Sequence, residues 1–174
     1  ALVASYHRGA CLISSAGGCT SMMLYQALNR SPAFSFDSMR TAGQFVAWSM
    51  ESFEAFQKEA NATTQHGKLV DVGTTIEGNH VYLNFEFTTG DASGQNMVTI
   101  ATQAVCDYIK NSCPVPIQQL YVEGNLSGDK KASSQAYTSV RGRKVTAEVV
   151  LTPALLDKYV HATPRQLIDY WRMS

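Results

Sequence analysis

Residues 88–97 read TTGDASGQNM and join an alternating segment to one with helical spacing. Residues 81–87 before this stretch alternate as in a strand, and apolar residues after it recur at helical spacing up to Ile109. The two glycines keep side chains away from the junction, and Asp91 stands where an N-cap is expected. Free N–H groups in a first helical turn suit a phosphate or another anion. An ordinary capped helix start explains the same residues, because this is neither a Walker loop nor a GxGxxG motif.

The segments around this turn predict the order strand, helix, strand, strand, helix, strand. We expect strands over 32–36, 68–76, 80–87 and 117–122, a hairpin turn at 77–79, and helical segments beginning near Asp37, Ser52 and Ala92. This order is that of a ferredoxin-like split βαβ sandwich, so the predicted fold class is α+β. The fold alone implies no function.

The two ends of the chain have a different pattern. We interpret residues 1–4 as part of a strand and residues 20–28 as a helix. Near the C-terminus, an alternating strand over 144–151 precedes two helices that begin at Thr152-Pro153 and Thr163-Pro164.

We therefore expect three segments in the domain organisation. Residues 32–123 form the ferredoxin-like small domain, inserted in a partial α/β large domain to which residues 1–31 and 124–174 belong.

Composition excludes several classes of protein. Of 174 residues, 45% are apolar, and the 14 Lys and Arg balance the 14 Asp and Glu, so no basic surface for nucleic acid is indicated. No apolar run approaches the roughly 20 residues of a membrane-spanning helix, and no signal peptide is visible. The four cysteines could form two disulfides in principle, but reduced thiols in a cytoplasmic protein are preferred. Their spacing is not that of a metal finger, and we expect no metal site. They are Cys11, Cys19, Cys106 and Cys113.

A second loop, EGNLSGDKK at residues 123–131, follows the last predicted strand of the small domain. Together with residues 88–97 it resembles the 3-hydroxy-3-methylglutaryl-coenzyme A reductase family. In that family a GDAMGMN segment contacts the nicotinamide cofactor, and an SGN…DKK loop carries the catalytic lysine. Three further segments resemble its LVASTNRG, TRxP and GRGK elements, namely 2–9 (LVASYHRG), 29–32 (NRSP) and 141–144 (RGRK). Five motifs in the same order are far more specific than any one of them.

The resemblance implies a role for each charged residue of the second loop. Lys130 would be the catalytic lysine that polarises the thioester carbonyl, Lys131 would hold the substrate carboxylate, and Asp129 would orient the site. Two adjacent lysines in a loop are otherwise typical of a solvated surface. Glu123 replaces the family's serine, and its carboxylate would repel a substrate carboxylate unless it is protonated or turned away.

Further substrate contacts are implied on three other segments. Arg30 matches the family's substrate-binding arginine, and Asn125 matches the asparagine of its SGN motif. Three residues fall where the family contacts coenzyme A: Ser5, His7 and Arg8.

For the cofactor, the resemblance implies contacts in the glycine-bearing turn, made by Asp91, Ser93, Gly94, Gln95 and Asn96. Thr64 and Gln65 fall where the family's serine–arginine pair binds the 2′-phosphate of NADPH. Glutamine in place of arginine removes a bidentate phosphate partner, although His66 or Lys68 could supply charge instead. We expect NADPH, with NADH as the alternative.

By resemblance, the chain is part of an NAD(P)H-dependent oxidoreductase of the mevalonate pathway of isoprenoid biosynthesis. The family reduces the thioester of 3-hydroxy-3-methylglutaryl-coenzyme A to mevalonate with two NADPH, at a site formed between two subunits, which implies a homodimer or higher homo-oligomer. We expect a catalytically incomplete fragment, because the family's catalytic glutamate, aspartate and histidine lie outside the matching motifs. The alternative is a non-enzymatic ferredoxin-like module that binds a nucleotide or a protein. An RNA-binding module is disfavoured, because paired aromatic motifs and a basic bias are missing.

Overall fold

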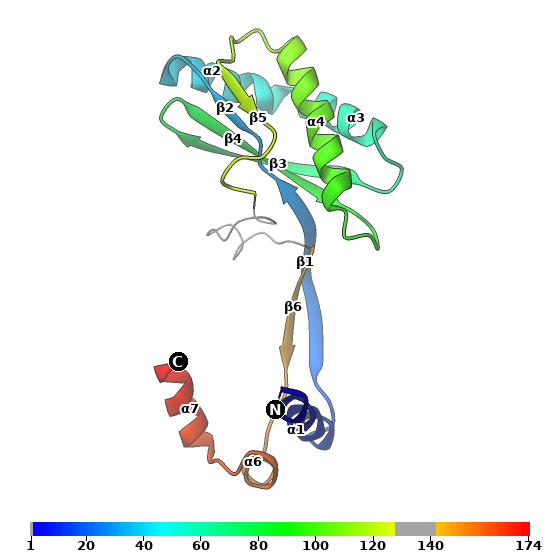
Figure 1. Cartoon of the computed structure of the whole chain (residues 1–174), viewed down its shortest axis with the longest axis vertical. Coiled ribbons are helices and arrows are strands. Elements are labelled where there is room, and N and C mark those ends of the chain that lie inside the picture. The colour runs from blue at the N-terminus through cyan, green and yellow to red at the C-terminus, as the bar shows by residue number, and fades with distance from the viewer. Residues whose placement is uncertain (1, 128–141) are drawn as a thin grey trace. The chain divides into compact units, whose positions relative to one another are not determined.

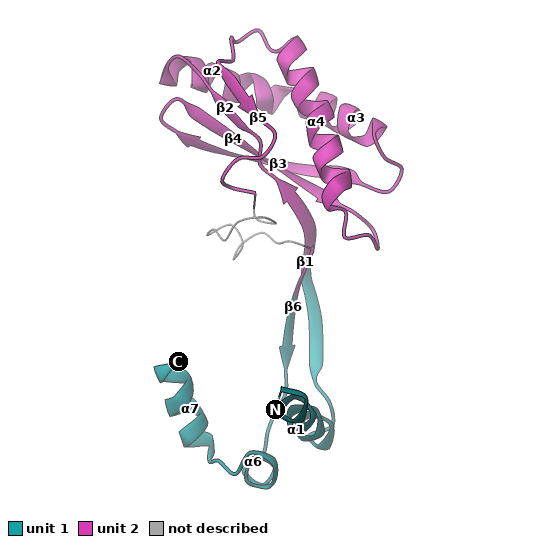
Figure 2. Cartoon of the chain, in the orientation of Figure 1, with its two compact units in different colours: residues 1–24, 145–174 teal, residues 25–144 magenta. Residues whose placement is uncertain are grey.

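The computed structural model describes residues 2–127 and 142–174 (Figure 1). The chain forms two compact units, one of residues 25–144 and one of residues 1–24 together with 145–174 (Figure 2). The chain passes between the units within two strands, β1 (Thr20–Arg30) and β6 (Gly142–Glu148). The domain boundaries expected from the sequence stay predictions.

The larger unit is built on an antiparallel sheet. Its further strands are β2 (Ala33–Ser35), β3 (Lys68–Glu77), β4 (His80–Thr88) and β5 (Gln119–Tyr121). The sheet has the order β5-β2-β4-β1-β6, and β3 also pairs with β4. In β4, Phe87 lies opposite Leu28 of β1 and also opposite Leu69 of β3, so β1 and β3 occupy the two edges of β4.

The strands β1 and β2 follow one another along the same edge of β4. Residues 28–30 lie opposite 85–87, and residues 33–35 lie opposite 80–82. Ser31 and Pro32 interrupt this line of strand pairing in its middle. The interruption leaves the backbone N–H and carbonyl of Ser31 to be satisfied elsewhere, whereas the carbonyl of Pro32 still accepts from the N–H of Leu83 in β4 at 3.2 Å.

Three helices of the larger unit share one hydrophobic core with the sheet. They are α2 (Met39–Glu51), α3 (Phe53–Ala62) and α4 (Gln95–Ser112). Alternate residues of β4 supply one side of the core, because side chains two apart share a face of a sheet; they are Val81, Leu83, Phe85 and Phe87. The helices supply buried side chains such as Phe45, Phe56 and Val105. The helices and strands expected over residues 32–122 are thereby confirmed, apart from the start of α4.

The smaller unit contains α1 (Leu2–Ser15), α6 (Pro153–Val160) and α7 (Pro164–Met173). The helices α1 and α6 are linked by a hydrogen bond of 2.7 Å between the hydroxyls of Ser15 and Tyr159. Proline in the first turn of α6 and α7 follows an N-cap threonine, as the sequence predicts.

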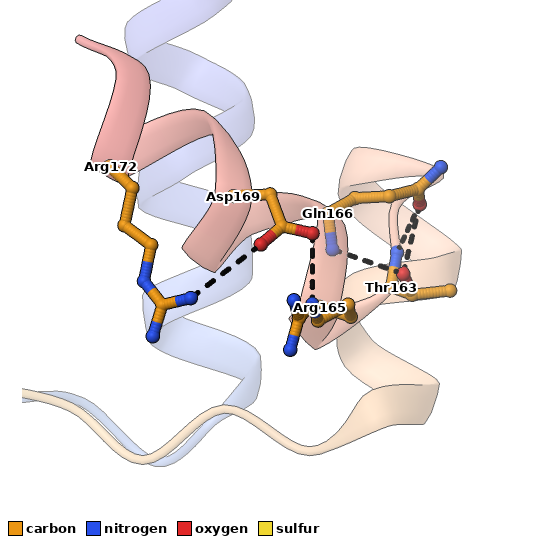
Figure 3. Close-up of polar contacts among 5 residues, drawn as sticks. All are labelled: Thr163, Arg165, Gln166, Asp169 and Arg172. Carbon is orange, nitrogen blue, oxygen red and sulfur yellow. Dashed lines mark hydrogen bonds and ion pairs between the residues drawn. The ribbon is translucent and has the colours of Figure 1, made fainter.

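The helix α7 has a capping box (Figure 3). The backbone N–H of Gln166 donates to Thr163 Oγ1, and the backbone N–H of Thr163 donates to Gln166 Oε1. Asp169 lies between two arginines, with a carboxylate oxygen 2.9 Å from Arg165 Nε and another 4.0 Å from Arg172 Nη1. These local contacts stabilise a helix that has no buried residue.

The first thirty residues contradict the sequence prediction. The segment expected to begin as a strand forms the helix α1, and the segment expected to be helical, residues 20–28, lies in the strand β1. The strand is stabilised by pairing with β4, where Leu28, Asn29 and Arg30 become buried. This pairing involves residues far along the chain, so the local pattern does not report it.

Within the described ranges, no helix is both long enough and apolar enough to cross a membrane.

Candidate functional site

The turn that precedes α4 is longer than the sequence predicts. The helix begins at Gln95 with Gly94 as its N-cap, so the expected start at Ala92 and the expected N-cap role of Asp91 are both wrong. The physical reason is a separate turn before the helix. The hydroxyl of Thr89 donates to the carbonyl of Ala92 at 2.7 Å, and the N–H of Ala92 donates to the carbonyl of Thr89 at 3.2 Å.

Gly94 is required at the junction for two reasons. Its φ of 71° is in the left-handed region, where a side chain is strained. A Cβ atom at this position would also lie 2.4 Å from Thr89 Cγ2 and 2.7 Å from Thr89 Cβ. A glycine N-cap has no side-chain oxygen for the N–H groups of the first turn. This turn therefore keeps the positive end of the helix dipole near an approaching ligand.

A pocket of about 430 Å³ opens beside this turn. The turn lines it with residues 89–93 and Gln95, and the neighbouring strands contribute residues 26–28 of β1, Phe87, and residues 142–143 of β6. The structure thus brings Asp91, Ser93 and Gln95 to one pocket. The family resemblance implies that all three contact the cofactor. Gly94 lies within the same turn.

The sequence pattern did not identify two polar residues that line the pocket, Gln26 and Arg143. Arg143 Nε donates to Gln26 Oε1 at 3.3 Å, and Arg143 Nη2 lies 3.6 Å from Asp91 Oδ1. Gln26 Nε2 in turn donates to the carbonyl of Gly90 at 3.4 Å. Arg143 belongs to the RGRK segment that matches a family motif, so a signal for it was present. Gln26 carried no signal, because only strand pairing brings it to the pocket.

The remaining cofactor residues lie around the first turn of α4. Asn96 is exposed there. The hydroxyl of Thr64 donates to the sulfur of Met97 at 3.0 Å, which places the loop after α3 against this turn. Gln65 is exposed in the same loop. The structure therefore brings Thr64 close to the turn that carries Asn96.

A second group of predicted residues meets where β1 gives way to β2. The side chain of Arg30 is fully buried, and its Nη1 atom lies 3.4 Å from Oε2 of Glu123, whose side chain is 41% exposed. The carboxylate that replaces the family's serine is thus directed at a buried guanidinium. This ion pair joins two of the residues that the sequence assigns to substrate binding.

Backbone contacts fix the loop that carries Glu123. The N–H of Gly124 donates to the carbonyl of Ser31 at 2.7 Å, and the N–H of Ser31 donates to the hydroxyl of Ser127 at 3.1 Å. A Cβ atom on Gly124 would lie 2.8 Å from that carbonyl oxygen, so only glycine permits the approach. Ser31 Oγ also contacts Asn84 Oδ1 and the carbonyl oxygen of Leu126. The break in strand pairing at residue 31 is where this loop is held.

The other predicted substrate residues lie in the loop after Gly124, on the smaller unit or outside the described residues. Asn125 is exposed in the loop after Gly124. Three predicted coenzyme A contacts lie exposed on α1 of the smaller unit: Ser5, His7 and Arg8. Three residues of the lysine loop fall outside the described residues: Asp129, Lys130 and Lys131.

Burial is the main cause of the raised pKa values of Tyr25, Cys106 and Cys113 in the larger unit. Burial raises the pKa of the Cys106 thiol in α4 to about 12, so this cysteine is no nucleophile at neutral pH. Burial, with a hydrogen bond to Glu86, raises the pKa of Tyr25 above its usual range. All four cysteines are free.

Comparison with known proteins identifies relatives along the whole chain. The family model of hydroxymethylglutaryl-coenzyme A reductase matches residues 1–174. The 3-hydroxy-3-methylglutaryl-coenzyme A reductase of Haloferax volcanii is 38% identical over 97% of this chain and 41% of its own length. That of Pyrococcus abyssi is 37% identical over 97% of this chain and 41% of its own length. The chain therefore spans about two fifths of the length of these relatives.

A solved structure has a similar fold. The class II 3-hydroxy-3-methylglutaryl-coenzyme A reductase from Streptococcus pneumoniae, bound to NADPH, aligns with a TM-score of 0.62 and 16% identity. The alignment covers 85% of this chain and 38% of that protein. At this identity the likeness concerns the fold, a mixed arrangement of helices and an antiparallel sheet.

Proposed function

Since the chain belongs to the hydroxymethylglutaryl-coenzyme A reductase family, we propose that it forms part of an oxidoreductase of the mevalonate pathway. The reaction is reduction of the thioester of 3-hydroxy-3-methylglutaryl-coenzyme A to mevalonate with two NADPH. The observation that carries this proposal is the pocket beside the glycine-bearing turn, where three predicted cofactor residues meet. The chain would supply the cofactor pocket and part of the substrate site.

The domain arrangement is part of the same proposal. Residues 32–123 form a ferredoxin-like domain inserted in a larger substrate domain, to which residues 1–31 and 124–174 belong. The strand order β5-β2-β4, with β3 on the other edge of β4, supports the ferredoxin-like topology. In this arrangement α4 follows β4 directly, so the cofactor turn lies at the end of a central strand.

NADPH is the proposed cofactor, with NADH as the alternative. The uncapped first turn of α4 favours an anionic group, and Arg143 adds a guanidinium that lines the same pocket. When bound, the cofactor supplies a hydride. Asn96, Thr64 and Gln65 would contact it beside the pocket, and Gln65 offers a weaker partner for a 2′-phosphate than an arginine does.

The substrate side is proposed around Arg30, Glu123 and Asn125. There Lys130 would stabilise negative charge on the thioester oxygen, while Lys131 and Asp129 bind and orient the acyl group. Ser5, His7 and Arg8 would contact coenzyme A. A homodimer, in which two subunits share one site, completes the proposal.

Calorimetric titration of the folded chain with NADPH, and separately with NADH, tests the cofactor site. We expect saturable binding that Asn96→Ala weakens about tenfold, because a polar contact in the first turn of α4 is lost. Asn111→Ala is the matched control, since Asn111 is exposed at the opposite end of the same helix. The control is expected to bind like the original chain.

The titration also separates the two cofactors. NADPH should bind more tightly than NADH, and Gln65→Arg should increase that preference by restoring a bidentate phosphate partner. A folded chain that binds neither nucleotide would contradict the proposed cofactor pocket. Nucleotide binding unaffected by Asn96→Ala would place the ligand elsewhere and favour a separate binding module.

A further inference from the structure

The ion pair between Arg30 and Glu123 assigns a role that the family resemblance does not give. We propose that Glu123 is a specificity-determining residue, which holds the guanidinium of Arg30 and thereby limits how tightly the anionic acyl group of the substrate binds. This inference rests on the proposed function, because it concerns the carboxylate of that substrate. It adds a reason for the glutamate that stands where the family has a serine.

Burial of Arg30 makes a nearby acceptor or negative charge necessary, and Glu123 supplies one such charge. Arg30 is fully buried, with its backbone held by pairing opposite Phe85 in β4. A guanidinium removed from water loses hydration and requires nearby anions or acceptors. The carboxylate of Glu123 lies 3.4 Å from Arg30 Nη1 and meets this requirement from the chain itself.

The loop that carries Glu123 cannot move away easily. Gly124, the next residue, is hydrogen-bonded to the carbonyl of Ser31, which directly follows Arg30. Ser127 closes the loop by accepting from the N–H of Ser31. Because both partners of the ion pair are next to this backbone contact, the fold holds the backbones of residues 30 and 123 close together.

Of the two paired side chains, that of Glu123 is the one accessible to solvent. Its side chain is 41% exposed, whereas that of Arg30 is buried. A ligand carboxylate that approaches the pair is therefore attracted by Arg30 and repelled by Glu123, so the two Coulomb energies oppose one another. Removal of the negative charge at position 123 removes that repulsion.

The test is an NMR titration of the chain with 3-hydroxy-3-methylglutarate, followed through the backbone amides of residues 30 and 124. We expect Glu123→Gln to bind this acid about tenfold more tightly than the original chain does, because one carboxylate repulsion is gone. Glu123→Ser should act in the same direction. The neutral dimethyl ester of the acid should gain no affinity from either change.

Two further variants separate charge from folding. Glu123→Asp keeps the charge and should bind the acid as the original chain does. Glu77→Gln removes an exposed carboxylate from the hairpin between β3 and β4, and should leave the affinity unchanged. A purely structural role for Glu123 would change the thermal stability of its variants without changing their preference for acid over ester.

Each outcome decides one question. Tighter binding of the acid, and not of the ester, by Glu123→Gln supports the inference. Equal or weaker binding of the acid by this folded variant overturns the inference and leaves the proposed function intact. Absence of acid binding in the original chain and in every variant contradicts the proposed substrate site itself, and the inference with it.

Discussion

Two arginine–carboxylate pairs of the larger unit have similar separations and different surroundings. Arg30 lies 3.4 Å from Glu123, and Arg143 lies 3.6 Å from Asp91. The side chain of Arg30 is fully buried, whereas that of Arg143 is 54% exposed and its partner is fully exposed. Distance alone would rank the pairs as equals, but solvent makes them different interactions.

The difference in burial indicates that the two arginine–carboxylate pairs have different roles. A buried arginine cannot lose a negatively charged partner cheaply, so we expect the pair of Arg30 and Glu123 to stabilise the break between β1 and β2. An exposed pair is worth little, so Arg143 can leave Asp91 when an anionic ligand enters the pocket. We therefore expect the first pair to set the charge of a site and the second to rearrange around a ligand.

The largest effect should come from deletion of the buried cation. Arg30→Ala is expected to lower the free energy of unfolding by about 3–5 kcal/mol, because a large, fully buried side chain is lost and a cavity is left. Arg143→Ala should stay within about 0.5 kcal/mol of the original chain. Urea unfolding of both variants measures the contrast. Equal losses of unfolding free energy in the two variants would contradict the expected difference between the two pairs.

A smaller effect is expected where the loop of Glu123 meets the strand. Gly124→Ala should cost about 1–3 kcal/mol, because its new methyl group would lie 2.8 Å from the carbonyl oxygen of Ser31. Gly73→Ala in β3 is the matched control, since its methyl group would lie 3.6 Å from the nearest atom, an ordinary contact. Urea midpoints are the measurement. If Gly124→Ala is as stable as the control, the loop is not held by this close approach.

Local sequence signals predicted most elements of the larger unit. Ser38 caps α2 through the N–H of Thr41, as a serine before an apolar periodic segment suggests. The turn at 77–79 joins β3 and β4, with Glu77 opposite His80. In each case the residues that form the contact lie within a few positions of one another, so the local sequence pattern is sufficient to predict the element.

Two elements in the first thirty residues were predicted wrongly, the helix α1 and the strand β1. The strand β1 was expected to be helical because its apolar residues also fit helical spacing, and only β4 decides between the two. The helix α1 was expected to begin as a strand; among the described residues, a hydrogen bond links it to Tyr159 near the other end of the sequence. Tertiary pairing overrides the local pattern at β1.

In the candidate sites too, local sequence identified some residues, and others are brought there only by distant parts of the chain. The glycine-bearing turn was found from its own residues, but the partners Gln26 and Arg143 reach its pocket only through β1 and β6. The sequence presented Glu123 as a source of repulsion toward a substrate. It could not show that Arg30 lies beside that carboxylate, because the chain between them includes almost the whole larger unit.

The smallest expected effect is the dependence of the two pairs on salt. Mobile ions screen exposed charges over a Debye length that falls from about 10 Å at 0.1 M to about 3 Å at 1 M salt, and they screen buried charges much less. Any difference in urea midpoint between Arg143→Gln and the original chain should therefore vanish as the salt concentration is raised. The difference caused by Glu123→Gln should persist, because Arg30 is left without that carboxylate inside the fold.

This measurement distinguishes burial from distance as the cause of the contrast. The two variants make the same kind of change, since each replaces one charged member of an arginine–carboxylate pair by glutamine. If the cost of Arg143→Gln survived high salt, Arg143 would be anchored as firmly as Arg30, and it could not be released to a ligand in the pocket. If the cost of Glu123→Gln disappeared with salt, water and ions would reach Arg30, and a ligand carboxylate would then meet a screened pair whose charge is no longer set by the fold.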